Sequence, residues 1–391
     1  MFSRRTDWNL APNRLTLAHQ EAVRAGRKIL DLTISNPTRA GIEYDKTAIL
    51  DALRNSAALD YDPQLKGLRG AREAVADYYS WEHGVSLDPE NLILTTSTSE
   101  GYSHVFRLLC NPGDEILVPK PSYPLFDFLA ELQDVKLAPY SLIYDHGWQT
   151  DFHSLEGACT QNSRAVIVVH PNNPTGSYVS EQERNQLNEL CRRNKLALIV
   201  DEVFLDYAHE RKCPSFTGNE GALTFTLSGL SKISALPQMK LAWIATTGPQ
   251  AEVAAAMQRL EVIADTYLSL NAPIQLAAPV VLEQRKAVQP RLVKRVRANL
   301  AELDCQLVQQ KSCSRLEVQG GWYAVLRIPV TRSDEDFAVE LLERESVLVH
   351  PGHFYDFPSD GYLVLSLITP ETDFYRGLSD LLQFADAPRL A

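Results

Sequence analysis

The chain has 391 residues, of which 45% are hydrophobic and 22% charged, and its formal net charge is −11. This length allows two or three domains around a sizeable core, and the composition is that of a globular protein. The acidic balance, with no long basic block, argues against nucleic acid or an anionic membrane as a partner.

The chain begins with "MFSRRTDWNLAPN", which carries two arginines but no apolar stretch behind them, so we expect no signal peptide. No run approaches the roughly 18 apolar residues of a membrane span. The six cysteines form no Cys-x-x-Cys pair, so neither a zinc site nor a disulfide framework is expected. These features predict a cytoplasmic protein without a metal site.

Short apolar runs alternate with longer amphipathic segments through the middle of the chain. The runs are rich in Val, Ile and Leu, which is typical of strands covered on both faces. Helices are expected between them, most clearly over 180–195, where Ser180 and Glu183 form a capping-box pattern. The predicted strands are 92–97, 114–119, 136–142, 165–170, 196–203, 223–228 and 241–247.

The repeated order of strand, helix and strand predicts an α/β fold. Its large domain, residues 46–278, should hold a mostly parallel seven-stranded sheet flanked by helices. A long charged helical region follows (roughly 279–311, interrupted near Pro290), and strand-like and helical segments come after it. We interpret residues 279–391 as a smaller α+β domain and expect residues 1–45 to pack with it.

Three groups of polar side chains follow predicted strands, at the sheet edge where parallel α/β domains collect ligands. Asp201 closes the run "LALIV", and Asn173 lies in the turn "HPNNPTG" after "AVIVV". Ser97, Thr98 and Ser99 open a helix after "LILTT", where free backbone N–H groups favour an anion. Considered alone, each feature is better explained by an ordinary turn or by helix capping.

Two lysines, Lys232 and Lys240, stand eight residues apart in "SGLSKISALPQMK". Small residues before Lys232 let other groups approach the backbone closely, and a buried lysine is costly unless its charge is lost or paired. The pattern indicates chemistry at Lys232 and an anion near Lys240. Considered alone, the same residues also fit a solvated turn.

In this order, the segments resemble the pyridoxal-phosphate-dependent aminotransferases of fold type I, the class I/II family, over nearly the whole chain. The resemblance implies that Lys232 holds pyridoxal 5'-phosphate as a Schiff base and that Asp201 pairs with the pyridine nitrogen. It also implies that Asn173 bonds the phenolic oxygen of the cofactor and that Tyr123, in "PSYP", stacks on the ring. With the ring nitrogen protonated, the cofactor can accept electrons, and Lys232 can act as a base.

The resemblance also extends to the residues that would bind the phosphate of the cofactor. Ser97 to Ser99 match the loop that surrounds it, and Lys240 stands where the family usually has an arginine. Tyr61 matches the tyrosine that reaches the phosphate of the neighbouring subunit, which implies a homodimer with active sites at the subunit interface.

Two further departures from the family pattern concern residues around the cofactor. Gly229 replaces the usual serine three positions before the lysine, with Ser228 beside it as a partial substitute. Phe204 replaces a tyrosine three positions after Asp201, so one hydrogen bond to the phenolic oxygen is missing. A lysine in place of the phosphate arginine keeps the charge but loses the bidentate fork.

The departure with the largest consequence is Val364 in "YLVLSLIT", where the family normally has the arginine that binds the substrate α-carboxylate. We therefore expect atypical carboxylate recognition, by Asn36, His353 or Arg327. A substrate without that carboxylate is the alternative.

The predicted function is transfer of an amino group between a small-molecule amino donor and a keto acid or aldehyde. Another pyridoxal-phosphate reaction on the same fold, such as a β-lyase or decarboxylase, stays open because the cofactor carries the bond chemistry. A non-catalytic cofactor-binding protein is the third possibility, and the intact set of Lys232, Asp201 and Asn173 argues against it.

Overall fold

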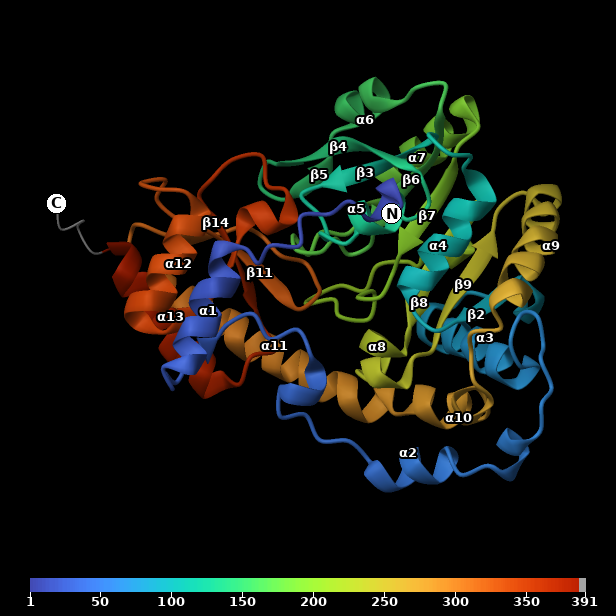
Figure 1. Ribbon diagram of the computed structural model, residues 1–391, viewed down its shortest axis with the longest axis horizontal. Helices are drawn as coiled ribbons and strands as arrows, with labels where there is room; N and C mark the ends of the chain where they lie inside the picture. The colour runs from blue at the N-terminus through green and yellow to red at the C-terminus, as the bar shows by residue number, and fades with distance from the viewer. Residues whose placement is uncertain (387–391) are drawn as a thin grey trace.

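Residues 1–386 are described by a computed structural model, which contains a large sheet flanked by helices and a smaller sheet towards the C-terminus (Figure 1). The large sheet has eight strands in the order β2-β9-β8-β7-β6-β3-β4-β5. Their bounds are β2 (Leu92–Thr95), β3 (Glu115–Lys120), β4 (Lys136–Tyr144), β5 (Trp148–Thr150), β6 (Ser163–Val169), β7 (Ala197–Asp201), β8 (Thr224–Gly229) and β9 (Ala242–Thr247).

All seven predicted strands are present, which confirms the α/β fold, but the strand count of seven was wrong. The additional strand, β5, pairs antiparallel with the end of β4 across a tight turn in which His146 and Gly147 have positive φ. Three residues are too few to give a periodic signal, so only the hairpin geometry reveals this strand. The sheet is mostly parallel, with β5 and β9 running against the other strands.

The large sheet is covered on both faces, as its apolar strands predict. In β3, Ile116 and Val118 face one layer and Leu117 faces the other, and all three are buried. One layer contains α4 (Thr98–Leu109), α5 (Phe126–Glu131) and α9 (Gln250–Tyr267). The opposite layer contains α3 (Arg69–His83), α6 (Phe152–Ala158), α7 (Glu181–Asn194) and α10 (Ala272–Glu283). The capping box predicted for α7 is confirmed, because Ser180 and Glu183 each accept the other's backbone N–H.

The smaller sheet lies beside the large one in Figure 1 and has the order β10-β11-β14-β13. Its strands are β10 (Ser314–Arg315), β11 (Tyr323–Arg327), β13 (His350–Pro351) and β14 (Tyr362–Ser366), and its helices are α12 (Asp334–Glu345) and α13 (Glu371–Asp386). The N-terminal helix α1 (Arg14–Arg24) packs against α12, and β1 (Leu30–Asp31) pairs with β12 (Val347–Leu348). These contacts support the expected domain boundaries, which stay a prediction.

The long helical region differs from its prediction. It consists of α10 and α11 (Arg285–Leu307), which join at Gln284, and Pro290 lies inside α11 without ending it. A proline removes one backbone donor, and its position in the second turn of a 23-residue helix leaves the other bonds in place. Within residues 1–386, no helix combines the length and the apolar character needed to cross a membrane.

Candidate active site

Lys232 lies on α8 (Leu230–Ile233), a single helical turn that follows β8. Its Nζ is 5.0 Å from the centre of the Trp322 ring and 5.4 Å from that of Phe204. Burial lowers the pKa of this amine to about 8, and the nearby carboxylate of Asp201 opposes the shift. Lys232 is therefore more often neutral at physiological pH than an ordinary lysine, which is the state that attacks a carbonyl.

Asp201 is the last residue of β7 and is buried. One carboxylate oxygen accepts a hydrogen bond from the Tyr102 hydroxyl at 3.1 Å, and the other accepts one from the backbone N–H of Val203 at 3.1 Å. Burial raises the pKa of Asp201 to about 6, against the effect of these hydrogen bonds and of Lys232. A cationic ring nitrogen beside Asp201 would favour its ionised form.

Asn173 and Tyr123 lie on loops at the same edge of the sheet. Asn173 follows β6 and is buried, yet its side-chain oxygen has no hydrogen-bond partner within residues 1–386. This buried oxygen is therefore available to accept a hydrogen bond from a ligand. Tyr123 is 42% exposed and packs edge-on against Phe126, with 6.3 Å between ring centres. One face of this loop is thus open to a flat ligand.

The N-terminus of α4 and Lys240 both lie at this edge. The antiparallel pairing of β2 with β9 ends at Thr95 opposite Ala242. Ser97 follows β2 by two residues and Lys240 precedes β9 by two residues, so both lie just beyond the end of this pairing. A helix N-terminus beside a lysine is a favourable place for a phosphate.

The hydroxyl groups at the start of α4 have different roles. Ser97 is the N-cap, and its side chain accepts the backbone N–H of Glu100 at 3.2 Å. Thr98 and Ser99 are the first helical residues and are partly exposed. Sequence analysis did not propose a role for Ser231, which lies in α8 directly before Lys232 and is partly exposed.

The close packing of β8 against β9 explains why position 229 is glycine rather than serine. A Cβ atom there would lie 2.8 Å from the Cβ of Ala242, 2.9 Å from its Cα and 3.0 Å from the carbonyl oxygen of Leu241. Strands β8 and β9 are therefore too close for any side chain at this position. The neighbouring Ser228 is buried and its hydroxyl donates to the backbone oxygen of Glu202 at 3.4 Å, so it already has a partner.

We expect Gly229→Ser to lower the free energy of unfolding by about 1–3 kcal/mol, because the atoms it meets belong mainly to backbone that cannot move aside. Gly70→Ser is the matched control, since a Cβ at that exposed helical position meets nothing within 4 Å. Urea unfolding of both variants measures the difference. Equal stability of the two would contradict the close approach of the strands.

Tyr61 lies in the loop before α3 and is exposed to solvent, with 82% of its surface accessible. This loop and residues 268–275 line a cavity of about 470 Å³. No contact in residues 1–386 joins Tyr61 to Lys232 of the same chain. Its exposure is compatible with the expected reach into a neighbouring subunit.

Val364 is buried in β14, directly opposite Val325 on β11 and His350 on β13. Residues directly opposite each other share a face of the sheet, and so do residues two apart on one strand. Tyr323 and Ser366 therefore lie on the same face as Val364, and the Ser366 hydroxyl donates to the backbone of the N-terminal segment.

The three residues expected to replace the missing arginine lie in different places. Arg327 is exposed at the far end of β11 from Tyr323, with its guanidinium 5.8 Å from the centre of the Tyr362 ring, so the structure does not bring it to Lys232. His353 is exposed on a short 3₁₀ helix. Asn36 caps another 3₁₀ helix through its side-chain oxygen, which accepts from Thr38.

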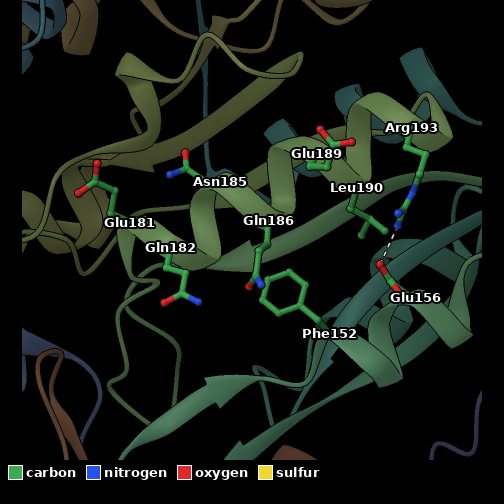
Figure 2. Close-up of a pocket in the computed structure, with 9 residues that line it drawn as sticks. All are labelled: Phe152, Glu156, Glu181, Gln182, Asn185, Gln186, Glu189, Leu190 and Arg193. Carbon is green, nitrogen blue, oxygen red and sulfur yellow. Dashed lines mark hydrogen bonds and ion pairs between the residues drawn. The ribbon is translucent and has the colours of Figure 1, made fainter.

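A larger cavity, of about 640 Å³, lies elsewhere, on the outer surface of α6 and α7 (Figure 2). Its lining is polar apart from Phe152 and Leu190, and the Glu156–Arg193 ion pair at 2.7 Å crosses one end. It contains none of the residues around Lys232, so volume alone does not identify the active site.

The fold and the residues around Lys232 define a pyridoxal-phosphate-dependent enzyme of fold type I. The orphaned Asn173, the lysine of lowered pKa beside Asp201, and the helix N-terminus beside Lys240 fit the ring and phosphate of this cofactor. A family model described as "Aminotransferase class I and II" matches residues 27–373, and the chain belongs to this family. The protein is an aminotransferase that uses pyridoxal 5'-phosphate.

The chain is similar to several characterised proteins. It is 27% identical to the glutamate-pyruvate aminotransferase AlaA of Haemophilus influenzae, covering 89% of both chains. It is 28% identical to the alanine aminotransferase of Mycobacterium tuberculosis, covering 94% of this chain and 88% of that protein. It is also 28% identical to the S-alkyl-thiohydroximate lyase SUR1 of Arabidopsis thaliana, over 78% of this chain and 68% of the lyase.

A solved structure of alanine aminotransferase from Pyrococcus furiosus has a TM-score of 0.89 to this chain, with 23% identity over 98% of this chain and 99% of the other. At this identity the likeness shows the fold. It supports the arrangement of a large and a small sheet described above.

Proposed function

We propose that this aminotransferase moves an amino group between an α-amino acid of the alanine or glutamate type and a keto acid, with the cofactor held by Lys232 as a Schiff base. The observation that carries the proposal is the partly buried Lys232 amine, whose pKa is lowered to about 8 and which lies near Asp201. The names of the relatives supply the substrate class.

Each residue would have a distinct task. Bound pyridoxal phosphate supplies an electron sink for the substrate α-carbon. Asp201 would hold a proton on the ring nitrogen, and Asn173 would bond the phenolic oxygen. Tyr123 would cover the ring. The amine of Lys232, once released by the substrate, would move the proton taken from the α-carbon.

The phosphate would lie at the same edge of the sheet, at the N-terminus of α4. Ser97, Thr98 and Ser99 would offer the backbone N–H groups and hydroxyls of the α4 N-terminus, and Lys240 would add a positive charge. The proposed homodimer would bring Tyr61 of a second subunit to this phosphate. A cytoplasmic location remains part of the same proposal.

The substrate carboxylate would be recognised without an arginine at position 364. His350 is the strongest candidate, because it lies directly opposite Val364. Its Nδ1 bonds the Tyr355 hydroxyl at 3.1 Å, and its Nε2 has no hydrogen bond within residues 1–386. His350 is partly buried, unlike His353, so a carboxylate here would be shielded from water.

We expect His350→Ala to raise the KM for alanine or glutamate roughly 10- to 100-fold, the cost of one hydrogen bond to a charged group, with a smaller change in kcat. His353→Ala is the matched control and should leave both constants nearly unchanged. Burial lowers the pKa of His350, whereas a bound carboxylate favours the protonated ring, so the KM of the parent should fall as the pH falls from 8 to 6. Equal KM values for the two variants would exclude His350.

A carbon–sulfur or other β-lyase is the second candidate, because one relative is named as a lyase. A panel of amino donors, including alanine, glutamate and a cysteine S-conjugate, separates the two functions. Conversion of the cofactor to its amine form, with release of the matching keto acid, supports amino transfer. Release of ammonia and a thiol from the S-conjugate, with no amine form, would overturn it.

A further inference from the structure

The helix that carries Lys232 is short, and backbone N–H groups satisfy only part of its carbonyl groups: Leu230 accepts from Ser234 at 3.2 Å, and Lys232 accepts from Ala235 at 3.1 Å. α8 has four residues, and a helix leaves the carbonyl groups of its last turn without partners inside the helix. The chain then turns back through Ala235, which has a positive φ of 53° and is fully buried. A positive φ is unfavourable for alanine, so the surrounding structure must hold this turn.

Three side chains donate hydrogen bonds to the carbonyl groups of this turn. The Tyr207 hydroxyl donates to the carbonyl oxygen of Lys232 itself at 2.7 Å. The side-chain nitrogen of Gln289 donates to Ile233 at 2.9 Å, and the Tyr44 hydroxyl donates to Ala235 at 2.7 Å. Tyr207 follows β7, Gln289 lies on α11, and Tyr44 precedes α2 (Lys46–Ala52), so three separate parts of the chain meet at one turn.

Two of these donors are themselves held in place. Gln289 also donates to Asp206 at 2.5 Å, and Asp206 is paired with His83 at 3.1 Å and accepts from the Tyr78 hydroxyl at 3.0 Å. Tyr207 is buried and packs edge-on against Trp322, one of the two rings beside the Lys232 amine.

The third donor connects the turn to the smaller sheet. Tyr44 belongs to the N-terminal segment, whose strand β1 pairs with β12 and whose backbone at Ile34 accepts from Ser366 on β14. A shift of that segment relative to the large sheet would therefore pull on the carbonyl group of Ala235.

We propose that Tyr207, Gln289 and Tyr44 are positioning residues that fix the backbone of Lys232. This inference rests on the proposed role of Lys232. The lysine side chain has four rotatable bonds, so the direction of its amine depends on a fixed Cα and on the rings of Phe204 and Trp322. Placement errors of about 1 Å can reduce turnover on the order of 100-fold.

Tyr207→Phe and Tyr44→Phe test the proposal, because each removes one hydroxyl and little volume. Tyr140→Phe is the control, matched in burial to Tyr207: the Tyr140 hydroxyl donates to the backbone oxygen of Ile167 at 2.8 Å, on the sheet rather than at the α8 turn. The purified holoenzymes are compared by visible circular dichroism of the bound cofactor, by pH titration of its visible absorbance, and by kcat and KM.

We expect Tyr207→Phe and Tyr44→Phe each to lower kcat on the order of 10-fold with little change in KM. Both should also weaken the visible dichroism and shift the absorbance titration. Tyr140→Phe should change none of these, although its urea unfolding curve should move as much as that of Tyr207→Phe. If Tyr207→Phe and Tyr44→Phe both have the same spectra and kcat as Tyr140→Phe, the inference is overturned. Borohydride reduction and peptide mapping of each variant identify the attachment site; labelling at a residue other than Lys232 would refute the proposed function instead.

Discussion

Lys232→Ala should reduce turnover on the order of 10⁵-fold, equivalent to about 7 kcal/mol of activation free energy. Under the proposed function, the variant would lose both the covalent anchor of the cofactor and the amine that moves the proton. Lys240→Ala is the control: Lys240 is exposed and is proposed to bind the phosphate, so its loss should weaken cofactor binding and leave the linkage at Lys232. Borohydride reduction of the parent followed by peptide mapping should label Lys232, and a label on Lys240 would contradict the assignment.

The lowered pKa of Lys232 adds a pH dependence to this prediction. Only the neutral amine attacks the cofactor, and its fraction rises with pH until the pKa, about 8, is passed. The rate at which pyridoxal phosphate attaches to the cofactor-free protein should therefore rise about tenfold per pH unit below 8 and level off above it. A rise that continues to pH 10 would show that the amine has the pKa of an ordinary exposed lysine.

Asp201→Asn should lower kcat by several orders of magnitude, at least about 4 kcal/mol, because an amide cannot hold the ring nitrogen protonated. The substitution has a local cost, since the two carboxylate oxygens accept from Tyr102 and Val203 and an amide has only one acceptor. Combining it with Tyr102→Phe removes the conflicting donor. The double variant should regain stability while its kcat stays low.

Glu202→Gln is the matched control for Asp201→Asn. Glu202 is the next residue and is also buried, but its carboxylate accepts from the Ser215 hydroxyl at 2.6 Å and from the backbone N–H of Phe216 at 2.5 Å, away from Lys232. Burial raises its pKa to about 7. We expect this variant to change stability and to keep kcat within about tenfold of the parent. A similar loss of kcat in both variants would mean that Asp201 acts through the fold.

The raised pKa of Asp201 also predicts how the cofactor-free protein responds to pH. Its folded-state pKa of about 6 exceeds the ordinary 3.8, so the folded protein binds the proton more tightly than the unfolded chain does. The contribution of Asp201 to the free energy of unfolding should therefore decline as the pH rises from about 4 to about 6. Subtracting the curve of the Asp201→Asn/Tyr102→Phe double variant from that of Tyr102→Phe should isolate this decline.

The sequence alone was sufficient for the α/β fold and for the cofactor. Seven apolar runs predicted strands because burial on both faces imposes a local composition, and Ser180 and Glu183 predicted the start of α7 because capping involves residues three apart. The placement of Lys232, Asp201 and Asn173 after strands of a parallel sheet predicted a ligand site, and the resemblance of these ordered motifs to the aminotransferase family implied that the ligand is pyridoxal phosphate. These are local patterns, which one stretch of chain carries by itself.

Tertiary structure decided what surrounds these residues. Trp322 reaches Lys232 from the smaller sheet, Tyr102 reaches Asp201 from a helix interior, and Gly229 is required because Ala242 lies against it. The register of β13 and β14, rather than a motif, brings His350 opposite Val364 and leaves Arg327 at the far end of β11. Such contacts join segments that are distant in sequence, so they depend on packing and strand register, for which a single sequence contains no local signal.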